Sequence, residues 1–202
     1  MADILDRRNT LRDNCLRLKL MPFNYVPFSS QRGTTAAMDT NTKIEGAHVI
    51  FYRQIKTSRD KSLRAVLLHK RTQNAPIHPG YWALFGGTLD PGEEPKDAAK
   101  REVKEELGLV EPKKRALVLK AARLKELGPP ARVSRPNGIG FIQYFCYGLD
   151  HDLDKLRLLW NAETEMVEGE GLGWFNAEEI HHLMVRPEDR IALIDFFKND
   201  GT

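Results

Sequence analysis

The sequence predicts a fold of the α+β class, because strand-like and helix-like segments occur together in one stretch of chain. Segments 47–54 and 64–71 are rich in β-branched and aromatic residues, as strands are, and a polar turn separates them. Segment 95–107 instead has apolar residues four apart, as one face of a helix requires. At 202 residues the chain is long enough for one well-buried domain with an extension.

The remaining segments extend this pattern in chain order. Residues 1–43 predict an N-terminal extension, made of a short amphipathic helix and a polar linker, and residues 44–202 predict the domain. Apolar, branched and aromatic residues predict strands at 81–87, 116–124 and 138–149, and a closing strand with the start of a helix within 171–184. Apolar residues at helical spacing predict a last helix at 189–198. Prolines, bases or acids predict loops at 125–138 and 150–170.

Composition and charge exclude several classes of protein. A net charge of +3 is mild, so neither nucleic acid nor an anionic membrane is expected as the main partner. No apolar run approaches the ~20 residues that span a bilayer, and the N-terminus lacks the apolar segment of a secretory signal. Cys15 and Cys146 lie far apart, which fits a reducing compartment better than a disulfide. We expect a soluble cytoplasmic protein whose oligomeric state, a homodimer included, stays open.

The predicted helix has a recognisable beginning, end and buried face. Pro95 fits the first helical position, where a missing N–H costs nothing, and Gly108 fits the left-handed residue that often ends a helix. At about 100° per residue, Ala99, Val103 and Leu107 form one narrow stripe. We expect this stripe to face the core.

Three acids, Glu102, Glu105 and Glu106, lie beside the apolar stripe on the same helix. Carboxylates at such spacings repel one another by about 0.2–0.5 kcal/mol per pair on an exposed helix, and more where water is scarce. A divalent cation would remove this repulsion, and hard oxygen ligands suit Mg²⁺ or Mn²⁺. For these residues alone a solvated helix face is the alternative, because lysines lie among them.

The complete segment that contains the helix favours the functional interpretation. Its pattern is Gly87, five residues, Glu93, seven residues, Arg101-Glu102, the aliphatic Val103, one residue, Glu105-Glu106, one residue, Gly108 and the aliphatic Leu109. Seven fixed letters recur by chance at about one in 10⁸ start points. The segment matches the signature of the Nudix hydrolase family at every defined position, so the chain resembles a Nudix hydrolase. Weaker similarity extends over about 45–195, with Phe85 where relatives usually have proline.

The resemblance implies both a fold and a reaction. The fold is an α/β/α sandwich, in which a mixed β-sheet lies between helices. The reaction is metal-dependent hydrolysis of a nucleoside diphosphate linked to another group, with a nucleoside triphosphate or a nucleotide sugar as the favoured small-molecule substrate and Mg²⁺ or Mn²⁺ as cofactor. Two alternatives stay open: a catalytically silent sensor that binds a nucleotide, and an RNA cap hydrolase, which would need a basic RNA track.

The same resemblance assigns roles to individual residues. The metal ligands it implies are the Gly86 carbonyl, Glu102, Glu105, Glu106 and an acid from a later loop, for which Glu168 is favoured over Glu170, with Glu163 and Glu165 behind them. Of the residues with catalytic roles, Glu105 is the candidate base and Glu102 is shared with the metal. Arg101 is expected to hold the carboxylates by charge-assisted bonds, and Glu93 to fix the loop against the helix through Arg101. Substrate contacts are expected from Arg71, Gly87 and Arg132.

Overall fold

The computed structural model describes residues 43–56, 62–110, 115–135, 138–161, 166–167 and 169–198. The predicted extension at 1–43, with Cys15, therefore lies outside the described residues except for Lys43. The division of the chain at residue 43 stays a prediction.

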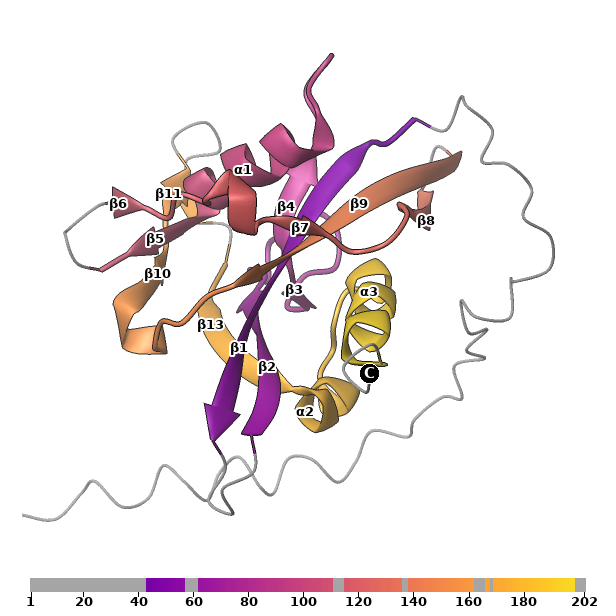
Figure 1. Cartoon of the computed structure of the whole chain (residues 1–202). Coiled ribbons are helices and arrows are strands. Elements are labelled where there is room, and N and C mark those ends of the chain that lie inside the picture. Colours follow the sequence, from indigo (N-terminus) through magenta and orange to yellow (C-terminus); the bar gives the residue numbers. More distant parts are fainter. Residues whose placement is uncertain are drawn as a thin grey trace, which may run out of the picture. The chain divides into compact units, whose positions relative to one another are not determined.

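Strands are the commonest regular element of the described chain, and Figure 1 shows them in sequence colours. In chain order they are β1 (Gly46–Lys56), β2 (Ser62–Lys70), β3 (Trp82–Ala83), β4 (Phe85–Thr88), β5 (Leu107–Leu109), β6 (Arg115–Ala116), β7 (Lys125–Glu126), β8 (Ala131–Arg135), β9 (Gly138–Gly148), β10 (Leu156–Leu158), β11 (Trp160–Asn161), β12 (Met166–Val167) and β13 (Gly171–Asn176).

Helices are fewer and lie on both sides of the strands. They are α1 (Pro95–Glu106), α2 (Ala177–His182) and α3 (Pro187–Lys198), with short 3₁₀ turns η3 (Ala121–Arg123) and η4 (Leu153–Lys155). Within the described ranges no helix is long and apolar enough to cross a membrane.

The central sheet is mixed, as predicted. Its strand order is β13-β2-β1-β9-β7, with β3, β4 and β8 paired at its sides. Strands β1 and β9 run parallel, whereas β2 runs antiparallel to both β1 and β13. A smaller sheet, β10-β5-β6, forms beside the end of α1.

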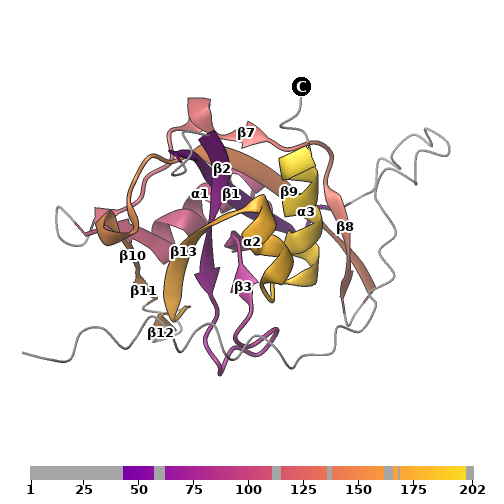
Figure 2. The same cartoon turned by 90° about the horizontal axis from the view of Figure 1, so that it is seen from below.

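Strand β1 shows how the two faces of the sheet are used. Ala47, Val49 and Phe51 are buried in one apolar cluster together with residues of α1, whereas Ile50 is buried in a second cluster with residues of α2 and α3. Side chains alternate between faces along a strand, so α1 covers one face and α2 and α3 cover the other. Figure 2 shows β1 and β2 between α1 and α3. The predicted α/β/α sandwich is confirmed.

Helix α1 buries the predicted stripe but ends differently from the prediction. Ala99, Val103 and Leu107 have no exposed surface. Leu107 is already extended, and Gly108 lies inside β5, so the expected left-handed glycine end was wrong. The carbonyls of Glu106 and Leu107 instead accept backbone N–H groups of Leu159 (2.8 Å) and Leu117 (2.7 Å), which satisfies the helix end by strand pairing.

The expected strand at 81–87 is two strands that pair with different neighbours. Strand β3 pairs with β2, whereas β4 pairs with β1, and Leu84 lies between them. The chain therefore changes partner at a single residue. This change brings β4, with Gly86 and Gly87, into contact with α1.

Three further expectations were wrong in detail. Segment 116–124 contains no long strand; Leu117 and Leu119 are buried while Val118 is 71% exposed, so the alternation serves core packing. The expected loop at 125–138 contains β7 and β8, which pair with β9. The expected loop at 150–170 contains short strands, of which β10 pairs with β5. Contacts with segments distant in sequence determine which of these residues form strands.

The core assignment can be tested at Leu107. We expect Leu107→Ala to lower the free energy of unfolding by about 2–5 kcal/mol, because it removes fully buried methyl groups beneath α1. Leu63→Ala is the matched control: its side chain is 40% exposed, so the change should stay below about 0.5 kcal/mol. Urea unfolding followed by circular dichroism measures both, and equal losses would contradict the assignment.

Candidate functional site

The loop before α1 is closed by a tight turn. Pro91 and Gly92 occupy its centre, and the Glu93 N–H donates to the Asp90 carbonyl at 3.0 Å. Gly92 has a φ of +81°, the positive value that the second central residue of a type II turn requires. The turn brings Glu93 back toward Asp90, whose N–H donates to the Glu93 carboxylate at 3.0 Å. Glu93 is thus fixed before the helix begins.

Arg101 joins this loop to the acids of α1. Its Nε and NH2 donate to the two carboxylate oxygens of Glu93, and its NH1 donates to Glu102, each at 3.0 Å. NH2 also donates to the Thr88 carbonyl at 3.0 Å. These hydrogen bonds lower the pKa of Glu93 and raise that of Arg101 further above its ordinary value. The predicted contact between Glu93 and Arg101 is present.

Gly87 gives the Glu102 carboxylate room. A Cβ built at Gly87 would lie 2.6 Å from Glu102 Cδ, a distance that real Cβ atoms do not adopt. Glu105 is placed more openly: its side chain is 45% exposed and lies 3.6 Å from Arg101 NH1. The three predicted carboxylates therefore differ in surroundings, and Glu105 is the most solvent-accessible.

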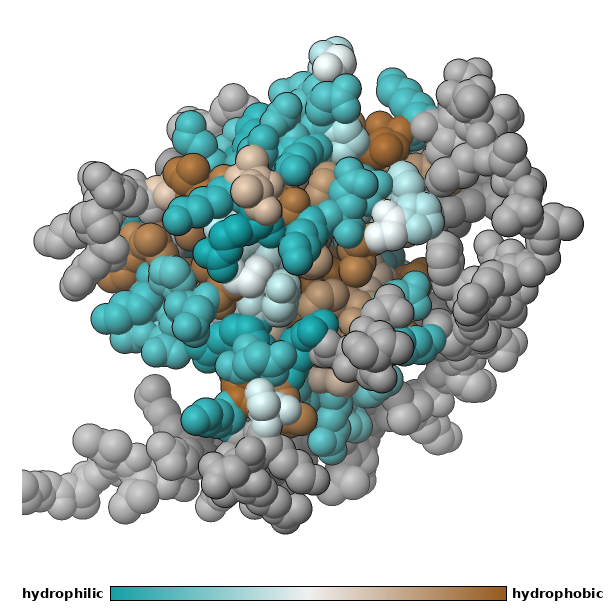
Figure 3. Space-filling model, viewed as in Figure 1, coloured by the Kyte–Doolittle hydropathy of each residue, from teal (hydrophilic) through white to brown (hydrophobic). Residues whose placement is uncertain are grey.

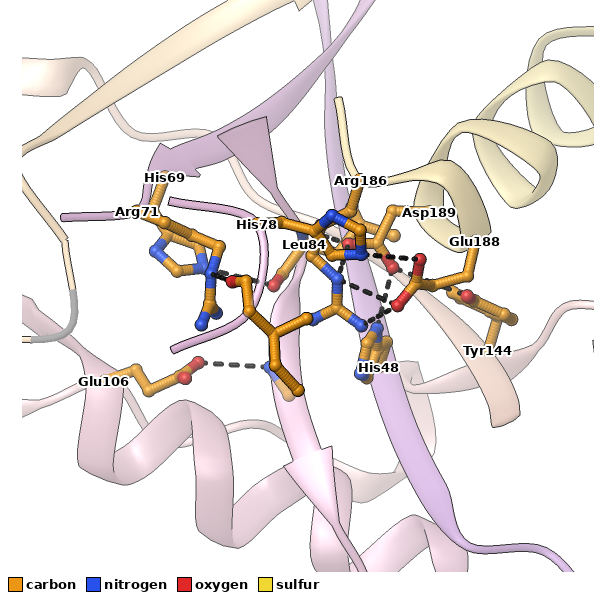
Figure 4. A network of polar contacts seen from close by, with 12 residues as sticks. His48, His69, Arg71, His78, Leu84, Glu106, Tyr144, Arg186, Glu188 and Asp189 are labelled. Atoms are coloured by element: carbon orange, nitrogen blue, oxygen red, sulfur yellow. Dashed lines mark hydrogen bonds and ion pairs between the residues drawn. The ribbon is translucent and has the colours of Figure 1, made fainter. Parts of the chain in front are cut away.

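Glu106 is the buried member of the three, at 8% exposed. Its Oε2 accepts the N–H of Gly86 at 3.1 Å, as Figure 4 shows. Gly86 has a φ of +138°, and a Cβ there would lie 2.7 Å from His48 Cα. Only glycine combines this backbone conformation with so close an approach to β1. The site thus joins α1 to β4 through one backbone hydrogen bond.

Two buried side chains hold the peptide groups of Leu84, two residues before Gly86. The Leu84 N–H donates to Asp189 Oδ2 at 3.1 Å, and His69 Nε2–H donates to the Leu84 carbonyl at 3.2 Å. His69 belongs to β2 and Asp189 to α3. Figure 4 shows both side chains converging on Leu84.

Asp189 is the centre of a buried polar network. His48 Nδ1–H donates to its Oδ1 at 2.8 Å, the Tyr144 hydroxyl approaches the same oxygen at 3.4 Å, and Arg186 lies 3.6 Å away. Burial alone would raise the pKa of Asp189, but Arg186, His48 and the Leu84 N–H bring it down to about 2. The carboxylate is therefore charged and fully paired.

Sequence reasoning missed this network. His48, His69 and Asp189 belong to no motif and come from three distant segments. One signal was present: His48 and His69 each interrupt an otherwise apolar strand, and a polar residue buried in a strand needs a partner. The partner itself, on the last helix, could not be identified from spacing.

The predicted substrate residues come from three segments, of which Gly87 in β4 lies beside Glu102 of α1. Arg71 follows β2, and its Nε donates to the Ile77 carbonyl at 3.1 Å. Arg132 lies in β8, whose principal contacts are with β9 and α3. Glu168, Glu163 and Glu165 lie outside the described residues. Glu170, the alternative to Glu168, accepts the Gln73 N–H at 3.0 Å and thereby joins its loop to the segment after Arg71.

Comparison with known proteins gives this geometry a family. A family model described as NUDIX domain matches residues 54–196, which is more than half of the chain. The chain belongs to the NUDIX family. The resemblance carried by the motif is therefore confirmed, and the match extends through β2, the motif and most of α3.

Curated relatives of this NUDIX domain match over a shorter stretch. Nucleoside triphosphatase NudI of Escherichia fergusonii is 50% identical over 44 residues, which are 22% of this chain and 31% of the relative. The NudI of Salmonella schwarzengrund is 52% identical over 42 residues, 21% of this chain and 30% of the relative. The chain spans about a third of the length of these relatives.

Solved structures agree with the fold of this NUDIX domain. The NUDIX domain of Shewanella oneidensis NrtR, complexed with ADP ribose, has a TM-score of 0.52 at 15% identity, covering 89% of this chain and 95% of that one. A C. elegans Ap4A hydrolase binary complex has a TM-score of 0.51 at 20% identity, covering 76% and 95%. At these identities the likeness concerns fold.

The donor groups at this site fit a hard divalent cation by their chemistry. Glu102 brings its carboxylate oxygens to Gly87, in space that a Cβ would fill, and Glu106 brings an oxygen to the Gly86 N–H. Such ligands suit Mg²⁺ or Mn²⁺. Within the described ranges, no three carboxylate, imidazole or thiolate groups already surround one point. Figure 3 shows hydrophilic side chains gathered over α1 on the face in view.

The close approach of Gly86 to β1 can be tested by adding one methyl group. Gly86→Ala should lower the free energy of unfolding by about 1–3 kcal/mol or more, because it combines backbone strain with a clash against His48. In Gly171→Ala, the matched control, the new Cβ meets nothing within 4 Å. Thermal unfolding measures the unfolding temperature of both variants. Equally small decreases in the two would contradict the close packing of β4 against β1.

The buried histidine predicts a pH dependence of stability. Burial, aided by Arg71, lowers the pKa of His69 from 6.5 to about 4, so the unfolded chain binds its proton at higher pH than the folded protein. The stability that depends on neutral His69 should be fully present above about pH 6.5. The free energy of unfolding should then fall by up to about 3 kcal/mol as pH decreases toward 4. Asp189 adds a loss below its ordinary pKa of 3.8, as pH falls toward 2.

Urea midpoints between about pH 7 and pH 4.5 measure this dependence. His69→Gln should flatten the profile, because a neutral amide binds no proton, while His181→Gln on the exposed side of α2 should leave it as in wild type. A wild-type profile that His69→Gln does not change would assign the acid sensitivity to other groups.

Proposed function

We propose that this domain hydrolyses the pyrophosphate bond of a nucleoside diphosphate linked to another group, with a nucleoside triphosphate or a nucleotide sugar as the favoured substrate. The observation that carries the proposal is the meeting of α1 and β4: Glu106 accepts the Gly86 N–H at 3.1 Å, while Glu102 lies against Gly87. Carboxylates beside a glycine backbone form an oxygen-rich site of the kind that phosphoryl transfer uses.

The residues of the site divide the work in this proposal. Phosphoryl transfer requires neutralised phosphate oxygens and an attacking water in line with the leaving group. When bound, Mg²⁺ or Mn²⁺ supplies positive charge and Lewis acidity toward the phosphate oxygens. Arg101 holds Glu102 and Glu93 in place, and Gly86 N–H orients Glu106. Glu105, the most exposed of the three predicted metal-ligand carboxylates, is the residue proposed to take the proton from the attacking water.

The named relatives support a nucleotide as substrate. NudI is a nucleoside triphosphatase, the C. elegans protein is an Ap4A hydrolase, and the Shewanella oneidensis domain is complexed with ADP ribose. All three names concern nucleotides with linked phosphates. They support the substrate class proposed for this chain, whereas the group beyond the diphosphate is a matter for experiment.

The remaining assignments belong to the same proposal. Arg71 and Arg132 are proposed as contacts to substrate phosphates, and Glu168 as an additional metal ligand. The cytoplasm is the proposed location, because Cys15 and Cys146 fit a reducing compartment. A homodimer stays open.

The proposal is tested with a panel of nucleoside triphosphates, nucleotide sugars and ADP-ribose in the presence of Mg²⁺ or Mn²⁺. We expect release of nucleoside monophosphate from at least one of them, together with pyrophosphate from a triphosphate or a sugar phosphate from a nucleotide sugar or ADP-ribose. Glu106→Gln should lower kcat by about 100-fold or more and weaken Mn²⁺ binding, since outer partners of metal ligands alone account for about 10–100-fold. Its fold should persist, because an amide fills the same volume.

Glu178→Gln is the matched control, on the exposed first turn of α2, and should behave as wild type in turnover and Mn²⁺ binding. Wild-type turnover in Glu106→Gln would refute the ligand assignment. No turnover of any compound, together with measurable nucleotide binding, would favour the silent sensor over the hydrolase.

A further inference from the structure

The Leu84 peptide lies at the point where the chain changes strand partners, and its hydrogen bonds come from side chains. Leu84 is 1% exposed, so its N–H and carbonyl need partners within the protein. Asp189 accepts the N–H at 3.1 Å, and His69 donates to the carbonyl at 3.2 Å. We call this arrangement of His69, Leu84 and Asp189 the Leu84 clamp.

The two arms of the Leu84 clamp come from different layers of the sandwich, His69 from strand β2 of the sheet and Asp189 from helix α3. Asp189 lies on α3, within the layer that packs against one face of the sheet. The His69 ring lies 5.1 Å from the ring of Phe85, whose side chain belongs to the α1 layer. The other ring nitrogen of His69 faces Gly169, where a Cβ would lie 3.1 Å away. His69 therefore lies between two segments that carry predicted metal ligands.

Asp189 is connected to Gly86 indirectly in two ways. The first runs along the chain, from the Leu84 N–H to Gly86 two residues later. The second runs through His48, which donates to Asp189 at 2.8 Å and whose ring carbon Cδ2 would lie 2.8 Å from a Cβ at Gly86. Gly86 in turn donates its N–H to Glu106. Contacts on the face of the sheet that α3 covers thus position the backbone segment from Leu84 to Gly86.

We propose that His69 and Asp189 are positioning residues, which fix the Leu84–Gly87 segment in the geometry that the α1 carboxylates require. The inference rests on the proposed function, because it assigns a purpose in cation and phosphate binding to that geometry. Neither residue needs to touch the substrate. Their effect is to remove freedom from the Gly86 backbone, whose N–H and carbonyl both face the site in this proposal.

The experiment compares substitutions at His69 that keep or remove the donor to Leu84. His69→Gln retains an N–H donor near the Nε2 position, whereas His69→Phe keeps the ring volume and removes the donor. Phe196→Leu, in the same apolar cluster as Leu84, is a control for lost stability that keeps both side-chain partners of the Leu84 peptide. If His69→Phe does not fold, His69→Asn replaces it, because its shorter amide does not reach the Leu84 carbonyl.

Three measurements are made on the full chain: hydrogen exchange of the Gly86 amide by NMR, Mn²⁺ affinity by electron paramagnetic resonance, and kcat and KM for any substrate found. His69→Phe should exchange faster at Gly86 and bind Mn²⁺ about 10–100-fold more weakly, with kcat lowered more than KM is raised. His69→Gln should lie within about 3-fold of wild type.

Equal loss of Mn²⁺ affinity in Phe196→Leu would reduce the Leu84 clamp to a stability effect and overturn the proposal. Wild-type Gly86 exchange and Mn²⁺ affinity in His69→Phe would overturn it as well. If the wild-type protein neither binds Mn²⁺ nor turns over a nucleotide, the proposed function fails, and Gly86 exchange in His69→Phe against Phe196→Leu alone decides the clamp.

Discussion

The hydrogen bond from the Gly86 N–H to Glu106 is the contact on which the candidate site depends. A carboxylate that is 8% exposed needs donors from the protein, and a backbone N–H two residues from a change of strand partner provides one. Because the donor belongs to β4 and the acceptor to α1, the bond fixes helix against sheet. Gly86 can make it only because it has no Cβ where β1 passes.

The sequence was sufficient for the fold class, the motif and the buried stripe of α1. Ala99, Val103 and Leu107 form a local pattern, and local patterns determine a helix wherever its neighbours lie. The contact of Glu93 with Arg101 was also accessible, because eight residues of separation within one loop and helix turn restrict what each can reach. The spacing of the motif identified the family, and the family resemblance predicted the α/β/α sandwich.

Contacts between distant segments could not be predicted from the sequence. Nothing local indicates that the expected strand at 81–87 divides at Leu84, because the division reflects a choice between β2 and β1 as partners. Asp189 likewise resembles an ordinary acid in the first turn of a helix, where it favours the helix dipole. Its burial against His48 and Leu84 becomes apparent only when α3 lies on the sheet. Pairing of this kind is a tertiary property.

The structure also changes the electrostatic argument for a cation. Repulsion among the α1 acids suggested that a divalent ion must offset it, yet Arg101 already offsets part of it, with hydrogen bonds of 3.0 Å to Glu93 and Glu102. Crowded acids by themselves are therefore weak evidence for a metal, since a guanidinium stabilises them too. The stronger evidence is the placement of the Glu102 carboxylate in the space of a Cβ at Gly87, because a purely structural ion pair with Arg101 has no need of a bare backbone beside it.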